Sequence, residues 1–156
     1  MTPLLFACAI GAGLVSGIFF AFSTFVMQAL GRLAPREGIS AMQSINIAVI
    51  NPWFFLPFFG TGVLCIATIA VALLTNSTDS FAAVLAGSFL YLFGCLGVTV
   101  AGNVPLNDSL AKANPGEAEA ESLWTRYLVS WTRWNHLRTA ASLAAAVAFV
   151  IALRTA

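Results

Sequence analysis

Four long apolar stretches dominate the pattern of hydrophobic and polar positions along the chain. The first three contain no charged residue and the fourth contains Arg138; they cover residues 4–30, 53–74, 81–101 and 137–153. A helix needs about 20 mostly apolar residues to cross the hydrocarbon core of a bilayer, and the fourth stretch can gain length from the helix before it. No alternating pattern typical of a membrane barrel occurs. We therefore predict an all-α integral membrane protein whose single domain, residues 1–156, is an antiparallel four-helix bundle.

The polar connections predict further short helices at the membrane surface. Residues 75–80 form a short polar turn between the second and third stretches. The first connection, residues 31–52, contains an amphipathic segment in which Gln43 and Asn46 lie on one face. Asn51 comes directly before a proline, which suits the cap and the first turn of the second membrane helix.

The third connection, residues 102–136, carries most of the charge of the chain. We expect Pro105 to end the third membrane helix, because proline lacks an N–H group and disfavours helix in the residue before it. Asn107 or Asp108 can then cap a short interfacial helix. No helix breaker follows residue 117, so one helix is expected to run from there through the fourth apolar stretch.

The distribution of basic residues predicts the orientation of the bundle. An even number of spans places both termini on one side of the membrane, where only Arg154 is basic. The other side carries Arg32, Arg36, Lys112, Arg126 and Arg133. By the positive-inside rule the long connections are cytoplasmic and the termini lie outside, in the cell membrane if the protein is bacterial.

Composition supports the membrane assignment and excludes some partners. Hydrophobic residues make up 60% of the chain and charged residues only 8%, against about 25% charged residues in a typical soluble domain. The net charge of +1 leaves no basic surface for nucleic acid. The expected partners are the lipid bilayer and a lipophilic small molecule, and the oligomeric state stays open.

The cysteines and the histidine do not predict a metal site. Cys8, Cys65 and Cys95 all lie in apolar stretches, and their odd number argues against a disulfide framework. We interpret them as small hydrophobic side chains that pack between helices. His136 is the only histidine, whereas a closed metal site usually needs three or four nitrogen or sulfur ligands.

Small residues predict where helices approach each other closely. They recur every four positions in the first stretch, at Ala9, Gly13, Gly17 and Ala21. Such a stripe lets two backbones come together, so we expect it to pack inside the bundle. Gly94, Val98 and Gly102 form a similar, weaker ridge in the third stretch.

Two polar segments at one end of the bundle are the candidate site, residues 103–108 and 131–139. Ionisable groups in a membrane are costly unless they face protein or water, so His136 and Arg138 need partners. At about 100° per residue, His136 falls nearly opposite Arg138. The face that contains the arginine comprises Trp131, Asn135, Arg138, Thr139 and Ser142.

Simpler interpretations exist for several of these residues. Trp124, Tyr127, Trp131 and Trp134 could form an aromatic belt at the membrane surface. Asn51 could act only as a helix cap, and His136 could be a structural histidine. Capping explains Asp108 almost as well as proton transfer does.

The chain resembles the anthrone oxygenase family of small membrane proteins, most of whose bacterial members have no assigned reaction. The resemblance covers essentially the whole chain and rests on residues 13–22, Met42, Gln43, Asn46, 51–53, 103–108 and 131–139. It implies a four-helix membrane fold. It also implies oxidation of anthrones to anthraquinones by molecular oxygen, without a metal or flavin cofactor.

An anthrone carries an acidic methylene, so a base and donors for an oxyanion could suffice for the reaction. We expect His136 or Asp108 to accept the proton. The donors to the oxyanion would be Asn103, Asn107, Asn135 and Arg138, and Trp131 and Trp134 would stack on the substrate. Gln43, Asn46 and Asn51 complete the candidate substrate-binding set. Two alternatives stay open: a non-catalytic binder of a flat molecule such as a quinone, and a structural membrane subunit.

Overall fold

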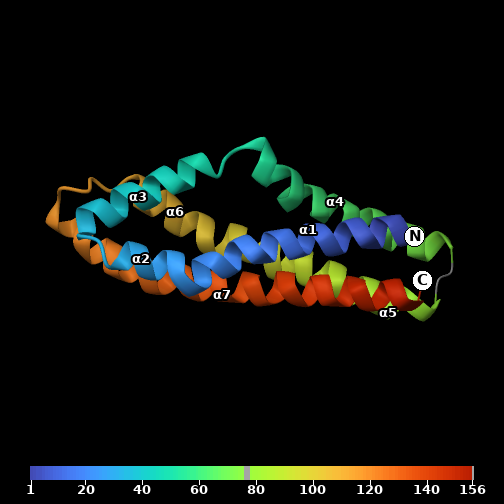
Figure 1. Cartoon of the computed structure of the whole chain (residues 1–156). Coiled ribbons are helices and arrows are strands. Elements are labelled where there is room, and N and C mark those ends of the chain that lie inside the picture. Colours follow the sequence, from blue (N-terminus) through green and yellow to red (C-terminus); the bar gives the residue numbers. More distant parts are fainter. Residues whose placement is uncertain (76–77, 156) are drawn as a thin grey trace.

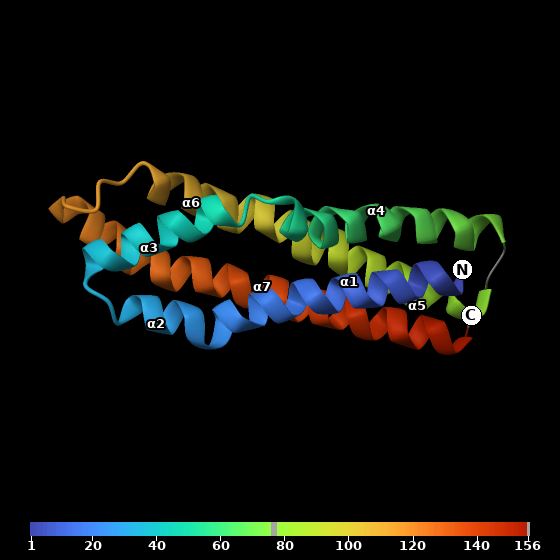
Figure 2. The ribbon, with the colours of Figure 1, turned by 45° about the horizontal axis from the view of Figure 1, so that its top comes forward.

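The computed structural model describes residues 1–75 and 78–155, and within these ranges the chain is all-α, without strands. Four helical runs are long and apolar enough to cross a membrane. They are Thr2–Gly31, Pro52–Leu74, Ser80–Ala111 and Glu119–Thr155. They contain the four predicted spans, which confirms the predicted fold class. Figures 1 and 2 show these runs side by side in one elongated bundle with both termini at the same end.

The first run and the helix after it form one edge of the bundle. The run comprises α1 (Thr2–Ala21), the π-helix η1 (Phe22–Val26) and α2 (Met27–Gly31). The amphipathic helix α3 (Pro35–Ala48) then turns back along α2 (Figure 1). A helix in the first connection was therefore predicted correctly.

The second run, α4 (Pro52–Leu74), begins at the predicted cap. The Asn51 side-chain oxygen accepts a hydrogen bond of 3.1 Å from the backbone N–H of Phe54, and its amide nitrogen donates to the Ala48 carbonyl at 2.8 Å. Asn51 thus provides an acceptor for a free N–H group at the start of α4 and a donor for a free carbonyl group at the end of α3. Residues 76 and 77 of the predicted turn after α4 lie outside the described residues.

The third run is irregular, and the expectation that Pro105 ends it is wrong. It comprises α5 (Thr78–Phe89), the π-helices η2 (Leu90–Gly97) and η3 (Thr99–Asn103), and α6 (Val104–Ala111). Pro105 lies in the first turn of α6, where a missing N–H group breaks no hydrogen bond. Asn107 and Asp108 lie inside α6, so neither caps it.

The last helix, α7 (Ala118–Thr155), is a single helix of 38 residues, as the absence of breakers predicted. At 1.5 Å per residue it measures about 57 Å, against a hydrocarbon core of about 30 Å. The helix is therefore longer than one membrane crossing needs, and α2, α3 and α6 pack around its N-terminal part.

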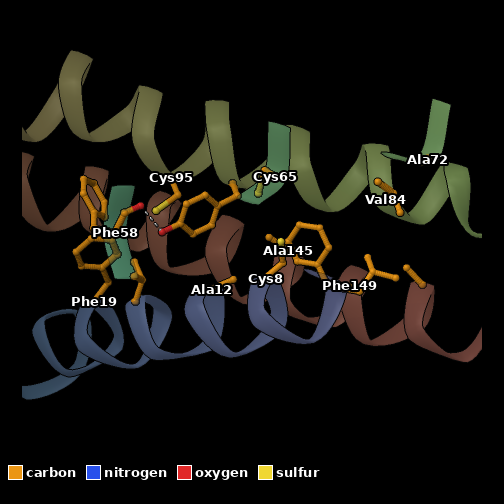
Figure 3. Close-up of a cluster of buried hydrophobic side chains, with 14 residues drawn as sticks. Cys8, Ala12, Phe19, Phe58, Cys65, Ala72, Val84, Cys95, Ala145 and Phe149 are labelled. Carbon is orange, nitrogen blue, oxygen red and sulfur yellow. Dashed lines mark hydrogen bonds between the residues drawn. The ribbon is translucent and has the colours of Figure 1, made fainter. Parts of the chain in front are cut away.

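The interior has two hydrophobic clusters, which share α7. The membrane cluster contains Phe19, Tyr91, Phe149 and the three cysteines, which are free and buried as expected. Figure 3 shows Phe19 and Phe58 at one end of this cluster and Ala72 and Val84 at the other. The head cluster lies around α2, α3 and the start of α7, and contains Met27, Ile39, Met42, Leu110, Trp124, Tyr127 and Trp131.

The small-residue stripe of α1 packs only in part as predicted, since Ala9 packs against the membrane cluster but the two glycines do not. A Cβ atom added at Gly13 or Gly17 would meet nothing within 4 Å, so these glycines face away from the bundle. The close approach to α4 occurs instead at Gly11, which contacts Thr61. In the third run the prediction is correct: Gly94 lies directly against Ala141, and Gly102 lies against the ring of Trp134.

Candidate functional site

Arg138 lies inside the bundle, only 6% exposed, where the two clusters meet. Its Nε donates a hydrogen bond of 2.9 Å to the side-chain oxygen of Asn135, and its Nη1 donates one of 3.4 Å to the Thr99 hydroxyl. Its Nη2 has no acceptor within residues 1–75 and 78–155. A guanidinium carries five N–H donors, so several remain for a ligand.

Aromatic rings cover the guanidinium in place of an acidic partner. Its central carbon lies 3.8 Å from the ring centroid of Phe19 and 4.9 Å from that of Trp131, which are cation–π distances. Every acidic side chain that the structure describes is exposed: Glu37, Asp108, Glu117, Glu119 and Glu121. The buried cation therefore has no counterion among the described residues. Since an unpaired buried charge is costly, this position favours an anionic ligand.

Asn135 fixes the arginine to the first helical run. Its amide nitrogen donates to the Phe19 carbonyl and to the Ser23 hydroxyl, both at 2.7 Å. These two bonds point the amide oxygen of the fully buried Asn135 toward Arg138. Phe22 packs against Trp131 beside them, with ring centroids 5.6 Å apart.

Two asparagines of the third run complete the cluster. The amide nitrogen of Asn103 donates to the Trp131 carbonyl at 3.1 Å, while its buried side-chain oxygen has no partner in the described structure. The side-chain oxygen of Asn107 accepts hydrogen bonds of 2.8 Å from both the Tyr127 hydroxyl and Trp131 Nε1. Asn107 therefore holds the indole ring in place.

Two π-helices supply residues to this cluster. Phe22 and Ser23 begin η1, and Thr99 and Asn103 are the first and last residues of η3. A π-turn changes the direction of side chains within a helix and is frequent at functional sites. Its presence on both helical runs that face Arg138 supports a functional cluster.

Other predicted site residues have structural contacts. Gln43 donates to the carbonyls of Leu110 and Ala113 at 2.8 and 3.0 Å, which ties α3 to α6. Asn46 lies near the Tyr127 hydroxyl, and its buried amide nitrogen has no acceptor in the described structure. Asn51 caps α4. Trp134 is 41% exposed and covers Gly102.

The two predicted proton acceptors lie outside the Arg138 cluster. His136 is exposed and lines an outer groove with Thr132 and Arg133, on the face of α7 opposite Arg138. Asp108 is exposed on α6, and no hydrogen bond joins it to the described cluster. The structure thus brings together Arg138, Asn135, Asn103, Asn107 and Trp131, but not His136 or Asp108.

Sequence reasoning missed Phe19, Ser23 and Thr99. Serine and threonine inside apolar helices often bond to their own backbone, so their presence alone indicates little. The one local signal is spacing, since Thr99 precedes Asn103 by four residues and Asn107 by eight. Tyr127 was counted only with the possible aromatic belt, yet it is buried and bonded to Asn107.

The donor atoms of the cluster suit a polar or anionic organic ligand. They are a guanidinium, amides, hydroxyls and an indole N–H. Among the described residues no group of three or more histidine, cysteine, aspartate or glutamate side chains could hold a metal ion.

A protein-family model described as anthrone oxygenase matches residues 53–148. The matched segment runs from the start of α4 into the last third of α7 and includes Asn103, Asn135 and Arg138. No curated protein and no solved structure matches the chain.

Proposed function

The chain belongs to the anthrone oxygenase family, and from this membership and the surroundings of Arg138 we propose that it oxidises a flat, lipophilic ketone of the anthrone type with molecular oxygen. The reaction uses no resident cofactor. The observation that carries the proposal is a buried arginine without a carboxylate partner among the described residues, placed between aromatic rings.

The arginine would act by stabilising the enolate of the substrate. Loss of a proton from the methylene group leaves a negative charge mainly on the carbonyl oxygen. The free N–H groups of Arg138 can donate to that oxygen inside the bundle, where charge–charge interactions are stronger than in bulk water. Because Asn135 already orients the guanidinium, little reorganisation is needed when the charge develops.

The enolate is electron-rich enough to reduce oxygen directly. It gives electrons to O2, and a carbon–oxygen bond forms at the former methylene carbon. The resulting hydroperoxide loses water and leaves a second carbonyl group. Overall, one methylene and one O2 become one carbonyl and one water, so the atoms balance without another reductant.

Aromatic side chains would hold the flat substrate beside the arginine. Asn107 fixes the indole of Trp131. Phe19 lies against the guanidinium of Arg138, and Phe22 lies against the indole of Trp131. Ring stacking favours a planar aromatic substrate over an aliphatic one. Asn103 supplies an unpaired carbonyl oxygen that can accept a hydrogen bond from a phenolic hydroxyl group of the substrate.

His136 and Asp108 are the proposed proton acceptors. Since both side chains are exposed and no hydrogen bond joins them to the described cluster, the proton would reach them through water. Arg138 does not accept the proton. It lowers the free energy of the enolate, so a base that is reached only through water can still complete the proton transfer.

Oxygen uptake by the detergent-purified protein tests the proposal. With a simple anthrone we expect uptake well above the uncatalysed rate, and quinone as the product. Arg138→Met should lower the rate about 100-fold or more, the size typical for loss of one oxyanion donor. Arg126→Met, an exposed arginine on the same helix, is the matched control. Background uptake by the folded wild-type protein would refute the oxygenase function.

A further inference from the structure

A groove opens on the outer side of the bundle, on the face of α7 away from Arg138. It has a volume of about 380 Å³, within the range of small-ligand sites. It lies between the first helical run and α7, which Figures 1 and 2 show side by side. Its lining residues are Ser23, Met27, Gln28, Leu128, Val129, Thr132, Arg133 and His136.

The polar residues of the groove have unused hydrogen-bonding groups. Gln28, Arg133 and His136 are exposed, and none of them forms a hydrogen bond or ion pair with another described residue. No acidic residue lines the groove, whereas Met27, Leu128 and Val129 give it an apolar floor. The groove therefore combines one permanent positive charge, further donors and an apolar base.

The groove lies where both of its walls leave the hydrocarbon. On α7, Arg133 and His136 come directly before the apolar stretch 137–153. On the first helical run, Gln28 lies three residues before α2 ends at Gly31, and Arg32 follows that end. A cation at this height meets lipid headgroups, which lie at the ends of the apolar spans.

Exposed hydrophobic side chains on the two helices that form the groove indicate where the lipid chains lie. Phe20 and Phe25 of the first run are 57% and 61% exposed, and Leu137 of α7 is 49% exposed. An amphiphile with its charged group in the groove could lay its hydrocarbon chains over this surface.

We infer that the groove binds the headgroup of an anionic phospholipid. The phosphodiester oxygens would accept hydrogen bonds from the Arg133 guanidinium, with Gln28 and His136 as further donors. A zwitterionic headgroup also brings a positively charged quaternary ammonium group close to Arg133, so it binds there more weakly than an anionic headgroup. The groove shares Ser23 with the Arg138 cluster and His136 with the proposed oxidation. Arg133→Ala and Gln28→Ala leave both of these residues unchanged, so lipid binding and oxidation are tested separately.

Thermal unfolding in neutral detergent with added lipid tests this site. Dioleoylphosphatidylglycerol should raise the unfolding temperature of the delipidated full-length protein in a saturable way, and native mass spectrometry should detect the bound lipid. Dioleoylphosphatidylcholine should give little shift. Inorganic phosphate at the same concentration should also give little shift, because it lacks the lipid chains.

Matched arginine variants separate this groove from general charge attraction. Arg133→Ala should weaken the apparent affinity for phosphatidylglycerol about fivefold, the effect of one arginine at a membrane surface. Gln28→Ala should weaken it further in combination. Arg126→Ala, which removes an exposed arginine of α7 outside the groove, should leave it unchanged. Equal shifts with both lipids, or equal losses in Arg126→Ala and Arg133→Ala, would overturn the inference.

Discussion

Asn135 and Arg138 lie one turn apart on α7, and the side-chain oxygen of the first accepts a hydrogen bond of 2.9 Å from Nε of the second. The same asparagine donates to the Phe19 carbonyl and the Ser23 hydroxyl of the first helical run. Arg138 is therefore oriented by a residue that is itself held from another span. The position of the cation depends on the packing of the first run against α7.

Asn135→Ala should leave Arg138 in place but no longer oriented. We expect turnover of an anthrone to fall about 10- to 100-fold, since a displacement of about 1 Å in a catalytic group can cost two orders of magnitude. Oxygen uptake at saturating substrate measures the loss. Ser130→Ala, on the same helix and without a hydrogen bond in the described structure, serves as the control. Unchanged turnover in folded Asn135→Ala would contradict the positioning role.

Asn107→Ala should destabilise the protein more than a change at the next residue. It leaves the Tyr127 hydroxyl and Trp131 Nε1 without their acceptor, and each unsatisfied buried donor costs about 1–3 kcal/mol. Asp108→Asn alters an exposed side chain and should change the free energy of unfolding by only about 0.5 kcal/mol. Thermal unfolding in detergent compares the two variants, and equal effects would show that Asn107 does not hold the indole ring.

The assignment of the proton acceptor is tested by His136→Ala and Asp108→Asn. At least one of them should lower turnover about 100-fold, within the range typical of general base catalysis. Added imidazole should restore the rate of His136→Ala, or formate that of Asp108→Asn, because a small base can reach an exposed position through water. If both variants keep full turnover, proton transfer goes to water without either residue.

The two sets of glycines should respond differently to alanine. Gly13→Ala and Gly17→Ala place a methyl group where nothing lies within 4 Å, so the unfolding temperature should stay the same or rise slightly. Gly94→Ala brings a methyl group into contact with the Ala141 side chain and should cost about 1–3 kcal/mol as overpacking. A destabilising Gly13→Ala would indicate that this stripe packs against something outside the described bundle.

Helical periodicity predicted the interior face of α7 because the helix has no break. Trp131, Asn135, Arg138, Thr139 and Ser142 are all buried, and His136 lies on the exposed side. The calculation needs only a constant angle per residue, which a regular α-helix provides. The sequence did not predict which residues of other helices contact this face. Asn135 and Phe19 are 116 positions apart, and Arg138 and Thr99 are 39 positions apart.

Two predictions were wrong, one at a π-helix and one on a helix that is apolar on all sides. Pro105 did not end its span, because η3 places it in the first turn of a new helix segment, where proline fits. The stripe at Gly13 and Gly17 was assigned to the interior, yet α1 is apolar on every side. The lipid-facing side and the protein-facing side of a membrane helix are both apolar. Hydrophobicity therefore does not identify which side of α1 packs against the other helices.

The unbroken course of α7 makes it a molecular ruler. Arg138 lies 20 residues after the start of the helix at Ala118, a distance of about 30 Å along a rigid axis. The distance and the rotation of Arg138 relative to the head cluster are therefore both fixed by this helix. One residue inserted between Tyr127 and Trp131 would turn everything beyond it by about 100°. The number of residues between the head cluster and Arg138 is therefore as important to the site as their identity.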